Sequence, residues 1–224
     1  MAEDEQYWDN NFAYGLGLFT ADGSMSCDGR HFDFTSKDLQ QIENFKTSWG
    51  IENKITTKKS GYSGKTYLRV QFGNVKLYKF LLSIGLMPNK SLIIRRLKIP
   101  IDYFPDFLRG YFDGDGSISF NKHPESKLPQ VKIRFASGSV EFLGWLGESI
   151  KKIINTEGGS LCHVNGAWQL AYYKRDSLKV ISKMYHNNCA ISLERKRRRS
   201  SRFLEISPDF SPARWQNRFT VRTK

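Results

Sequence analysis

Residues 15–23 of the chain read GLGLFTADG, and residues 108–116 read LRGYFDGDG. Both stretches are apolar in the middle, carry small residues one helical turn apart, and end in Asp-Gly followed by Ser. Glycine is disfavoured inside a helix by about 1 kcal/mol relative to alanine, so its repeated use needs a compensating reason. Close packing of the two stretches supplies one, because the side chains at a contact set the distance between two helix axes.

The repeat predicts two motif helices, over residues 12–22 and 105–115, that pack against each other. The small residues expected at their contact are Gly17, Ala21, Gly110 and Gly114. Strips of small residues are best known from helix pairs in membranes, but their steric basis is the same in water. This packing would bring together Asp22 and Asp115, the last residues of the two helices.

Two carboxylates that meet in this way repel each other unless something binds them. Asp22 and Asp115 would each lie at the negative end of a helix dipole and would face a like charge. A divalent cation reverses that balance, and magnesium in particular prefers hard oxygen ligands. The alternative is that each Asp-Gly pair only begins a turn, which would suit a single copy better than two matching copies. The pair therefore indicates a functional site.

The two stretches resemble the paired motifs of the LAGLIDADG homing endonucleases, in the form in which one polypeptide carries both copies. The second copy keeps these positions of the family pattern: Leu108, Gly110, Asp113, Gly114, Asp115 and Gly116. The first copy keeps Gly17, Leu18, Ala21, Asp22 and Gly23. It departs from the pattern at Gly15, Leu16 and Thr20, the last of which stands where an acid is common. None of these three positions carries the catalytic acid.

The resemblance implies an α+β fold of two pseudo-symmetric α-β-β-α-β-β-α modules, whose antiparallel sheets form a saddle and whose motif helices pack at the module interface. We expect a first module at residues 1–99, a second at 100–205 and a C-terminal tail at 206–224. The hydrophobic pattern agrees with this order. In the first module it predicts a hairpin at 24–34, a helix at 37–49, a strand at 67–72 and a helix at 75–84. In the second it predicts strands at 118–121 and 131–135, a helix at 140–154, two strands within 161–173 and a helix at 177–185.

Polar side chains alternate with apolar ones along the predicted strands, which gives each sheet a polar, basic face. The major groove of DNA admits a two-stranded ribbon, and Arg and Gln can each make two hydrogen bonds to one base. The residues predicted to contact DNA from this face are Arg69, Gln71, Ser119, Asn121, Lys132 and Arg134. The alternative is that the alternation reflects only a solvent-exposed sheet face.

The chain of 224 residues has a formal net charge of +13. This charge favours a polyanionic partner, since neutralising phosphates releases counterions, although a ribosomal or membrane-surface protein would share it. No apolar stretch approaches the ~20 residues that a membrane span needs, and the acidic opening fits neither a secretory signal nor a transit peptide. We therefore expect an intracellular protein, either in an organelle (mitochondrion or chloroplast) or in a bacterial cytoplasm. The three cysteines predict neither a disulfide framework nor a zinc site.

The resemblance also assigns roles outside the motifs. Lys90 and Lys196 match the two places where the family positions a basic residue near the scissile phosphate; either could instead be a solvated surface charge. Backbone carbonyls of Ala21 and Gly114 would join the two acids in holding Mg²⁺. We expect Mn²⁺ to substitute and Ca²⁺ to support binding without cleavage.

The implied function is a site-specific, metal-dependent endonuclease that makes a staggered break at a long, asymmetric target in double-stranded DNA. The residues expected to be catalytic are Asp22, Asp115, Lys90 and Lys196. We expect a monomer that needs no protein partner and no membrane. Two alternatives of another class would use the same scaffold: an RNA-binding intron maturase and a non-cleaving DNA-binding regulator.

Residues 195–202 read RKRRRSSR, the densest run of positive charge in the chain. The run is compatible with a clamp on a nucleic-acid backbone, a nuclear address or a solvated segment. The tail at 206–224 has no clear period, and we expect it to be packed by Phe210 and Trp215 or partly disordered.

Overall fold

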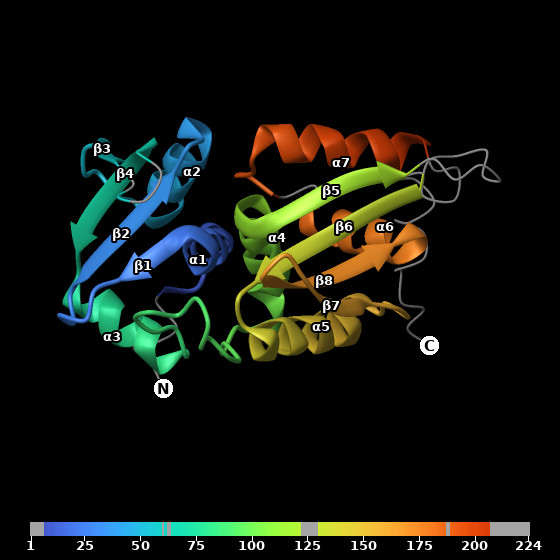
Figure 1. Cartoon of the computed structure of the whole chain (residues 1–224), viewed down its shortest axis with the longest axis horizontal. Coiled ribbons are helices and arrows are strands. Elements are labelled where there is room, and N and C mark those ends of the chain that lie inside the picture. The colour runs from blue at the N-terminus through green and yellow to red at the C-terminus, as the bar shows by residue number, and fades with distance from the viewer. Residues whose placement is uncertain (1–6, 60, 62–63, 122–129, 187–188, 207–224) are drawn as a thin grey trace, which may run out of the picture.

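The computed structural model describes residues 7–59, 61, 64–121, 130–186 and 189–206 (Figure 1). The first half contains α1 (Asn10–Asp22), β1 (Gly23–Met25), β2 (His31–Ser36), α2 (Leu39–Trp49), β3 (Thr56–Lys59), β4 (Thr66–Gly73) and α3 (Val75–Ser83). A 3₁₀ turn, η2 (Ile101–Tyr103), leads into the second half. That half contains α4 (Phe104–Asp115), β5 (Gly116–Asn121), β6 (Gln130–Ser137), α5 (Val140–Ile154), β7 (Ser160–Val164), β8 (Ala167–Tyr173) and α6 (Lys174–Met184), and α7 (Glu194–Ile206) follows it.

The two halves build matching sheets. Each is four-stranded and antiparallel, with the orders β1-β2-β4-β3 and β5-β6-β8-β7. Helices α1 and α4 lie side by side between the two sheets (Figure 1). The predicted α+β class and the repeated α-β-β-α-β-β-α order are therefore confirmed.

Side chains at the helix starts explain where the helices begin. Asp9 accepts a hydrogen bond of 2.6 Å from the backbone N–H of Phe12, and Asp38 accepts one of 3.1 Å from that of Gln40. Asn74 and Ser139 cap α3 and α5 in the same way. Because N-cap side chains satisfy the first backbone donors of a helix, α2 begins just after Asp38, two residues later than the sequence pattern predicts.

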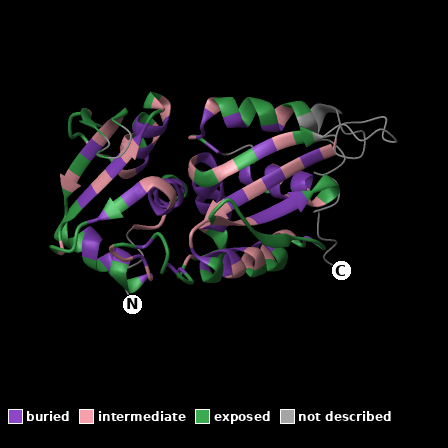
Figure 2. Ribbon diagram, viewed as in Figure 1, coloured by how far each residue is buried: buried purple, intermediate pink, exposed green. Residues whose placement is uncertain are grey.

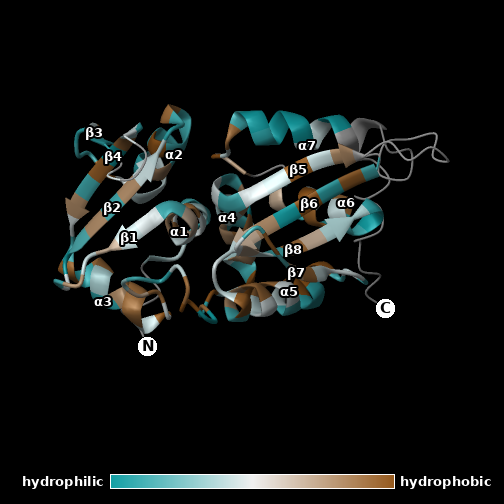
Figure 3. Ribbon diagram, viewed as in Figure 1, coloured by the Kyte–Doolittle hydropathy of each residue, from teal (hydrophilic) through white to brown (hydrophobic). Residues whose placement is uncertain are grey.

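Each sheet buries one face under its helices. Along β6, Val131, Ile133 and Phe135 are buried and their neighbours are partly exposed, which is the alternation expected of a half-buried strand. Figure 2 shows buried residues alternating with less buried ones along the central strands, and Figure 3 shows the matching alternation of hydropathy. In the first half Phe34 stacks on Phe45 with ring centroids 4.2 Å apart. The opposite faces of both sheets stay polar.

Two elements differ from the sequence prediction. Strand β3 pairs with β4, yet all four of its residues are exposed, so no apolar alternation marks it. Helix α7 contains the run at 195–202, which therefore does not form a solvated irregular segment. The tail predicted at residues 206–224 begins with Ile206, which is the last residue of α7, and residues 207–224 lie outside the described residues. Within the described residues, no helix is both long enough and apolar enough to cross a membrane.

Candidate active site

The contact between α1 and α4 depends on glycine. A Cβ atom on Gly17 would overlap the carbonyl oxygen of Phe107, and one on Gly110 would overlap the carbonyl oxygen of Tyr14. Backbone therefore meets backbone at both positions, which explains why the sequence tolerates a poor helix former inside both helices. The structure thus places the predicted small residues at the shared contact, which we call the seam.

The seam brings the two motif acids together at the ends of their helices. A Cβ on Gly114 would lie 2.4 Å from the Cβ of Ala21 and 3.1 Å from Oδ2 of Asp22. Asp115, the next residue, is exposed, although nearby protein atoms partly desolvate its carboxylate. Burial and then the nearby charge of Asp22 raise the pKa of Asp115 to about 6. Burial also raises the pKa of Asp22.

Gln41 on α2 is a site residue that the sequence reasoning missed. Its Nε2 donates a hydrogen bond of 2.5 Å to Oδ2 of Asp22, and its Oε1 accepts one of 2.9 Å from the hydroxyl of Ser36. These contacts fix the amide orientation and lower the pKa of Asp22 against the effect of burial. Among the described residues, no side chain donates a hydrogen bond to the Asp115 carboxylate. Gln41 is three residues after Asp38, the N-cap of α2. The equivalent position in the second half, three residues after the N-cap of α5, is occupied by Phe142.

Lys90 lies at the end of α1 and interacts with the charges of both acids. It is 7% exposed, and its Nζ donates a hydrogen bond to the carbonyl of Gly23, directly after α1. Burial lowers the pKa of Lys90 to about 8, against the opposing pull of the Asp115 and Asp22 charges. The alternative of a solvated surface charge is therefore wrong for this lysine.

Lys196 lies under the second acid and comes from α7. It is 5% exposed, and its Nζ lies within hydrogen-bond distance of four carbonyls at the end of α4, which its three N–H groups share. The acceptors are Phe112 (2.5 Å), Asp113 (2.8 Å), Gly114 (3.3 Å) and Gly116 (2.7 Å). Burial lowers its pKa to about 8. Lys196 is not a solvated charge either, and it already contacts the Gly114 carbonyl that the resemblance assigns to the metal.

Comparisons with known proteins identify the fold. Residues 9–85 match the family model described as a LAGLIDADG-like domain. The chain superposes on meganuclease I-SmaMI bound to uncleaveable DNA with a TM-score of 0.60 at 13% identity, covering 93% of this chain and 96% of that one. It superposes on homing endonuclease I-GzeII in complex with its DNA target with a TM-score of 0.57 at 12% identity, covering 93% and 92%. The chain has the two-module LAGLIDADG fold.

Another structural match is not named as an endonuclease. Full-length DUF199/WhiA from Thermatoga maritima superposes with a TM-score of 0.56 at 14% identity, covering 92% of this chain. This chain spans only 61% of the length of that protein. No curated protein matches the chain by sequence. The fold is thus shared between structures named as endonucleases and one that is not, so the fold alone does not establish cleavage.

The two repeated stretches, residues 15–23 and 108–116, differ at their sixth position. In the second motif, buried Asp113 accepts hydrogen bonds from the hydroxyls of Tyr14 (2.9 Å) and Tyr185 (2.8 Å) and from the backbone N–H of Leu193 (2.7 Å). In the first motif, Thr20 only donates to the carbonyl of Leu16 in its own helix, at 2.7 Å. Asp113 therefore fixes the segment that leads into α7, and the first motif has no equivalent link.

The predicted DNA-contacting residues lie on the polar faces of the sheets. Arg69 is held by Asp33 on the neighbouring strand through its Nε at 2.9 Å, and Gln71 is exposed beside them. Lys132 lies over the ring of Tyr173 at 4.8 Å. These placements agree with the predicted face and do not by themselves show contact with DNA.

The remaining predicted contacts belong to β5 and β6. Ser119 lies opposite Lys132, and Arg134 lies opposite Ser117. The Nε of Arg134 is buried and has no hydrogen-bond partner within the described chain. Asn121 pairs with Gln130 through the backbone, but its side chain lies outside what the structure describes.

The donor set at the seam suits a hard divalent cation. In the described residues no group of three or more His, Cys, Asp or Glu side chains could hold a metal, so the seam offers two carboxylates and backbone oxygens only. Magnesium accepts one or two carboxylates when phosphate and water complete its ligands. Burial raises the pKa of both acids, and a nearby cation would oppose this effect by favouring their charged forms.

Proposed function

We propose that this protein is a site-specific, metal-dependent DNA endonuclease that makes a staggered double-strand break at a long, asymmetric target. The observation that carries the proposal is the pair of acids at the seam, each with a buried lysine beside the end of its helix. Two carboxylates and two lysines in this arrangement supply one set of groups for each DNA strand.

The residues of the site suit phosphodiester hydrolysis. Asp22 and Asp115, with the carbonyls of Ala21 and Gly114, would hold Mg²⁺ or Mn²⁺. The bound ion would lower the pKa of a water ligand and stabilise charge on the scissile phosphate. Gln41 would keep Asp22 oriented through its amide hydrogen bond.

The lysines would act on developing charge. Because their pKa values are about 8, Lys90 and Lys196 can carry a positive charge at neutral pH and still exchange a proton. Both lie beside the acids and are held by backbone carbonyls, so they need little reorganisation to stabilise a negatively charged oxygen.

The polar sheet faces would bind double-stranded DNA. A net charge of +13 supports non-specific affinity for phosphates, and Arg69, Gln71, Lys132 and Arg134 would contact bases or backbone from the polar sheet faces. I-SmaMI and I-GzeII are themselves bound to DNA in their structures. The two halves of this chain differ in sequence, so a single molecule would read an asymmetric target without a partner subunit.

A second candidate function is binding without cleavage. The likeness to WhiA favours it, because that structure shares the fold and is not named as an endonuclease. An RNA-binding intron maturase would be a further use of the same surface. Both acids are present in this chain, which supports the nuclease.

A plasmid that carries the uninterrupted host gene separates these functions. We expect linear product with Mg²⁺ or Mn²⁺, and with Ca²⁺ a retarded complex without a cut. A retarded complex whose DNA stays uncut in Mg²⁺ would indicate a DNA-binding regulator and contradict the nuclease. Selective binding of the excised intron RNA, with no affinity for the plasmid, would identify a maturase.

A further inference from the structure

Helix α7 turns the densest run of positive charge in the chain into an ordered arginine face. Four arginines recur at i, i+3, i+4 and i+7 and therefore share one side of the helix. They are Arg195, Arg198, Arg199 and Arg202, all of them exposed. We call this side the arginine face. At 1.5 Å per residue it extends about 10 Å along the helix, roughly the rise of three phosphates on one DNA strand.

Lys196 and Ser200 on the other side of α7, and Leu193 just before the helix, are buried and anchor it, whereas Arg197 is exposed. Leu193, Lys196 and Ser200 are 0%, 5% and 1% exposed. The backbone N–H of Leu193 donates to Asp113, and Lys196 donates to the end of α4. A solvated segment or a flexible address would not bury these polar side chains. The arginine face is therefore held in a fixed position, which reduces the ordering cost of binding a ligand.

The charges on the arginine face are only weakly neutralised by the protein. Arg195 contacts Asp38 at 3.1 Å and Arg198 contacts Glu194 at 2.7 Å, but both pairs are exposed and such pairs contribute little. Within the described ranges, no carboxylate lies within 4.0 Å of Arg199 or Arg202. The face therefore keeps most of its positive charge available to an anion.

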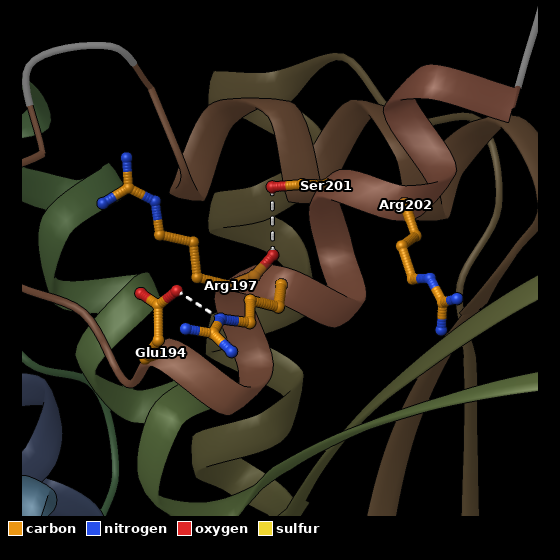
Figure 4. A pocket seen from close by; sticks show the side chains of 5 residues that line it. Glu194, Arg197, Ser201 and Arg202 are labelled. Atoms are coloured by element: carbon orange, nitrogen blue, oxygen red, sulfur yellow. Dashed lines mark hydrogen bonds and ion pairs between the residues drawn. The ribbon is translucent and has the colours of Figure 1, made fainter.

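The surroundings of α7 leave its arginine side chains accessible. An open pocket of about 610 Å³ is lined by Glu194, Arg197, Arg198, Ser201 and Arg202. Figure 4 shows the side chains of Arg197 and Arg202 extending away from the helix, while Ser201 turns back to the carbonyl of Arg197. The guanidinium group is planar and can donate two parallel hydrogen bonds to a phosphate.

The position of α7 links this face to the candidate active site. The helix packs beside β5, the edge strand of the second sheet (Figure 1). Its first turn donates a backbone hydrogen bond of 3.1 Å to Gln40 of the first half, one residue before Gln41. Lys196 lies within the same helix as the arginines. A strand held by the arginine face would therefore pass close to the second acid.

We propose that α7 is a DNA-backbone clamp that binds phosphates of one strand beside the cleavage site through its arginine face. The inference rests on the proposed DNA-binding function and adds a contact outside the sheets. It is sequence-independent, because arginines that meet phosphates carry no base information. It also makes the complex asymmetric, since no helix of the described residues has the corresponding position after α3.

The test compares two charge-removing variants of the full chain. Arg199→Gln/Arg202→Gln removes two charges from the arginine face. Lys151→Gln/Lys152→Gln removes two charges from exposed positions on α5, a helix that covers the buried side of the sheet. Affinity for a duplex of arbitrary sequence, about 40 base pairs long, is measured in EDTA over a range of salt concentrations.

For the arginine variant we expect the slope of log affinity against log salt to become shallower by about 1.8, with binding on the order of tenfold weaker at physiological salt. The lysine control should keep the slope of the unmodified protein. Equal losses in both variants, or none in the arginine variant, would overturn the clamp. A protein that fails to bind the duplex before any substitution refutes the proposed function instead, so the two failures are distinguishable.

Discussion

The two halves of the molecule hold equivalent acids in different ways. In the first half, Asp22 is bound by Gln41 from the adjacent helix, and Thr20 makes only a hydrogen bond within α1. In the second half, Asp115 has no side-chain donor among the described residues, while Asp113 binds three groups from elsewhere in the chain. The first acid is thus supported directly, and the second is supported through its helix.

This difference shows how a repeated motif can diverge and keep its geometry. The seam requires the same glycine contacts from both helices, so α1 and α4 end side by side. The side chains that support each acid lie outside the seam and differ between the two halves. Lys90 reaches one carbonyl from its own half, whereas Lys196 reaches four from α7. The second site therefore depends on a helix that the repeat does not predict.

The largest expected effect tests whether both acids are needed. Asp22→Asn or Asp115→Asn removes one of two carboxylates from the proposed metal site and the several kcal/mol that a bound metal contributes. We expect each variant to lower double-strand cleavage by at least about 1,000-fold and to leave Ca²⁺-supported binding within about threefold. Linear and nicked plasmid measured in Mg²⁺ report the first result, and gel retardation in Ca²⁺ reports the second. Cutting at an undiminished rate by either variant would refute the site.

Substitutions at the sixth motif position should destabilise the protein more in the second half than in the first. Asp113→Asn keeps only one acceptor oxygen for the buried donors around it and forces the Tyr185 hydroxyl to accept from the new amide or lose its partner, so we expect a loss of about 3 kcal/mol in unfolding free energy. Thr20→Val removes one hydrogen bond within a helix, and about 1 kcal/mol is expected. Urea unfolding followed by tryptophan fluorescence measures both values.

Hydrogen exchange distinguishes general destabilisation by Asp113→Asn from specific loss of the link between Asp113 and the segment before α7. Asp113→Asn should also expose the segment before α7, which Tyr185 and Leu193 hold through Asp113. Amide exchange at Leu193 should accelerate more than exchange in the seam, for example at Gly110. Uniform acceleration across α4 and the segment would contradict a specific link.

The sequence predicted what depends on local pattern. Glycine spacing and the terminal acids of the motifs are local, and they were sufficient to predict that α1 and α4 pack and end together. The places of Lys90 and Lys196 came from the family resemblance. Their burial could not be predicted, because it depends on carbonyls at the ends of helices that lie far away in sequence.

Three other features have no sequence pattern from which they could be predicted. Gln41 is a polar residue of an otherwise ordinary amphipathic helix, and its role follows only from how α2 packs beside α1. Strand β3 has four exposed residues and so no alternation. Helix α7 buries Lys196 and Ser200, so its inner side does not form the apolar stripe by which helices are predicted.

The smallest expected effect concerns the free energy of unfolding that the protein loses by keeping Asp22 and Asp115 charged when no metal is bound. The pKa of Asp115 is about 6 in the folded protein, above the ordinary aspartate value of 3.8, so folding disfavours its charged form. That cost is full above about pH 7 and disappears as pH falls from 6 to 4. In EDTA at neutral pH, Asp115→Asn should therefore stabilise the protein by on the order of 1 kcal/mol, a value discounted for the partial exposure of Asp115. Thermal melting at about pH 7.5 and about pH 4.5 measures the gain and its loss.

Gln41 decides whether the first acid behaves differently. Its hydrogen bond favours the charged form of Asp22, so Asp22→Asn should stabilise the protein less than Asp115→Asn does at neutral pH. In a Gln41→Met background that support is gone, and the gain from Asp22→Asn should rise to match that from Asp115→Asn. A double-mutant cycle on melting in EDTA isolates this coupling. Identical gains from Asp22→Asn with and without Gln41 would mean that the two acids are held alike, and that the contrast between the halves lies only in α7 and Asp113.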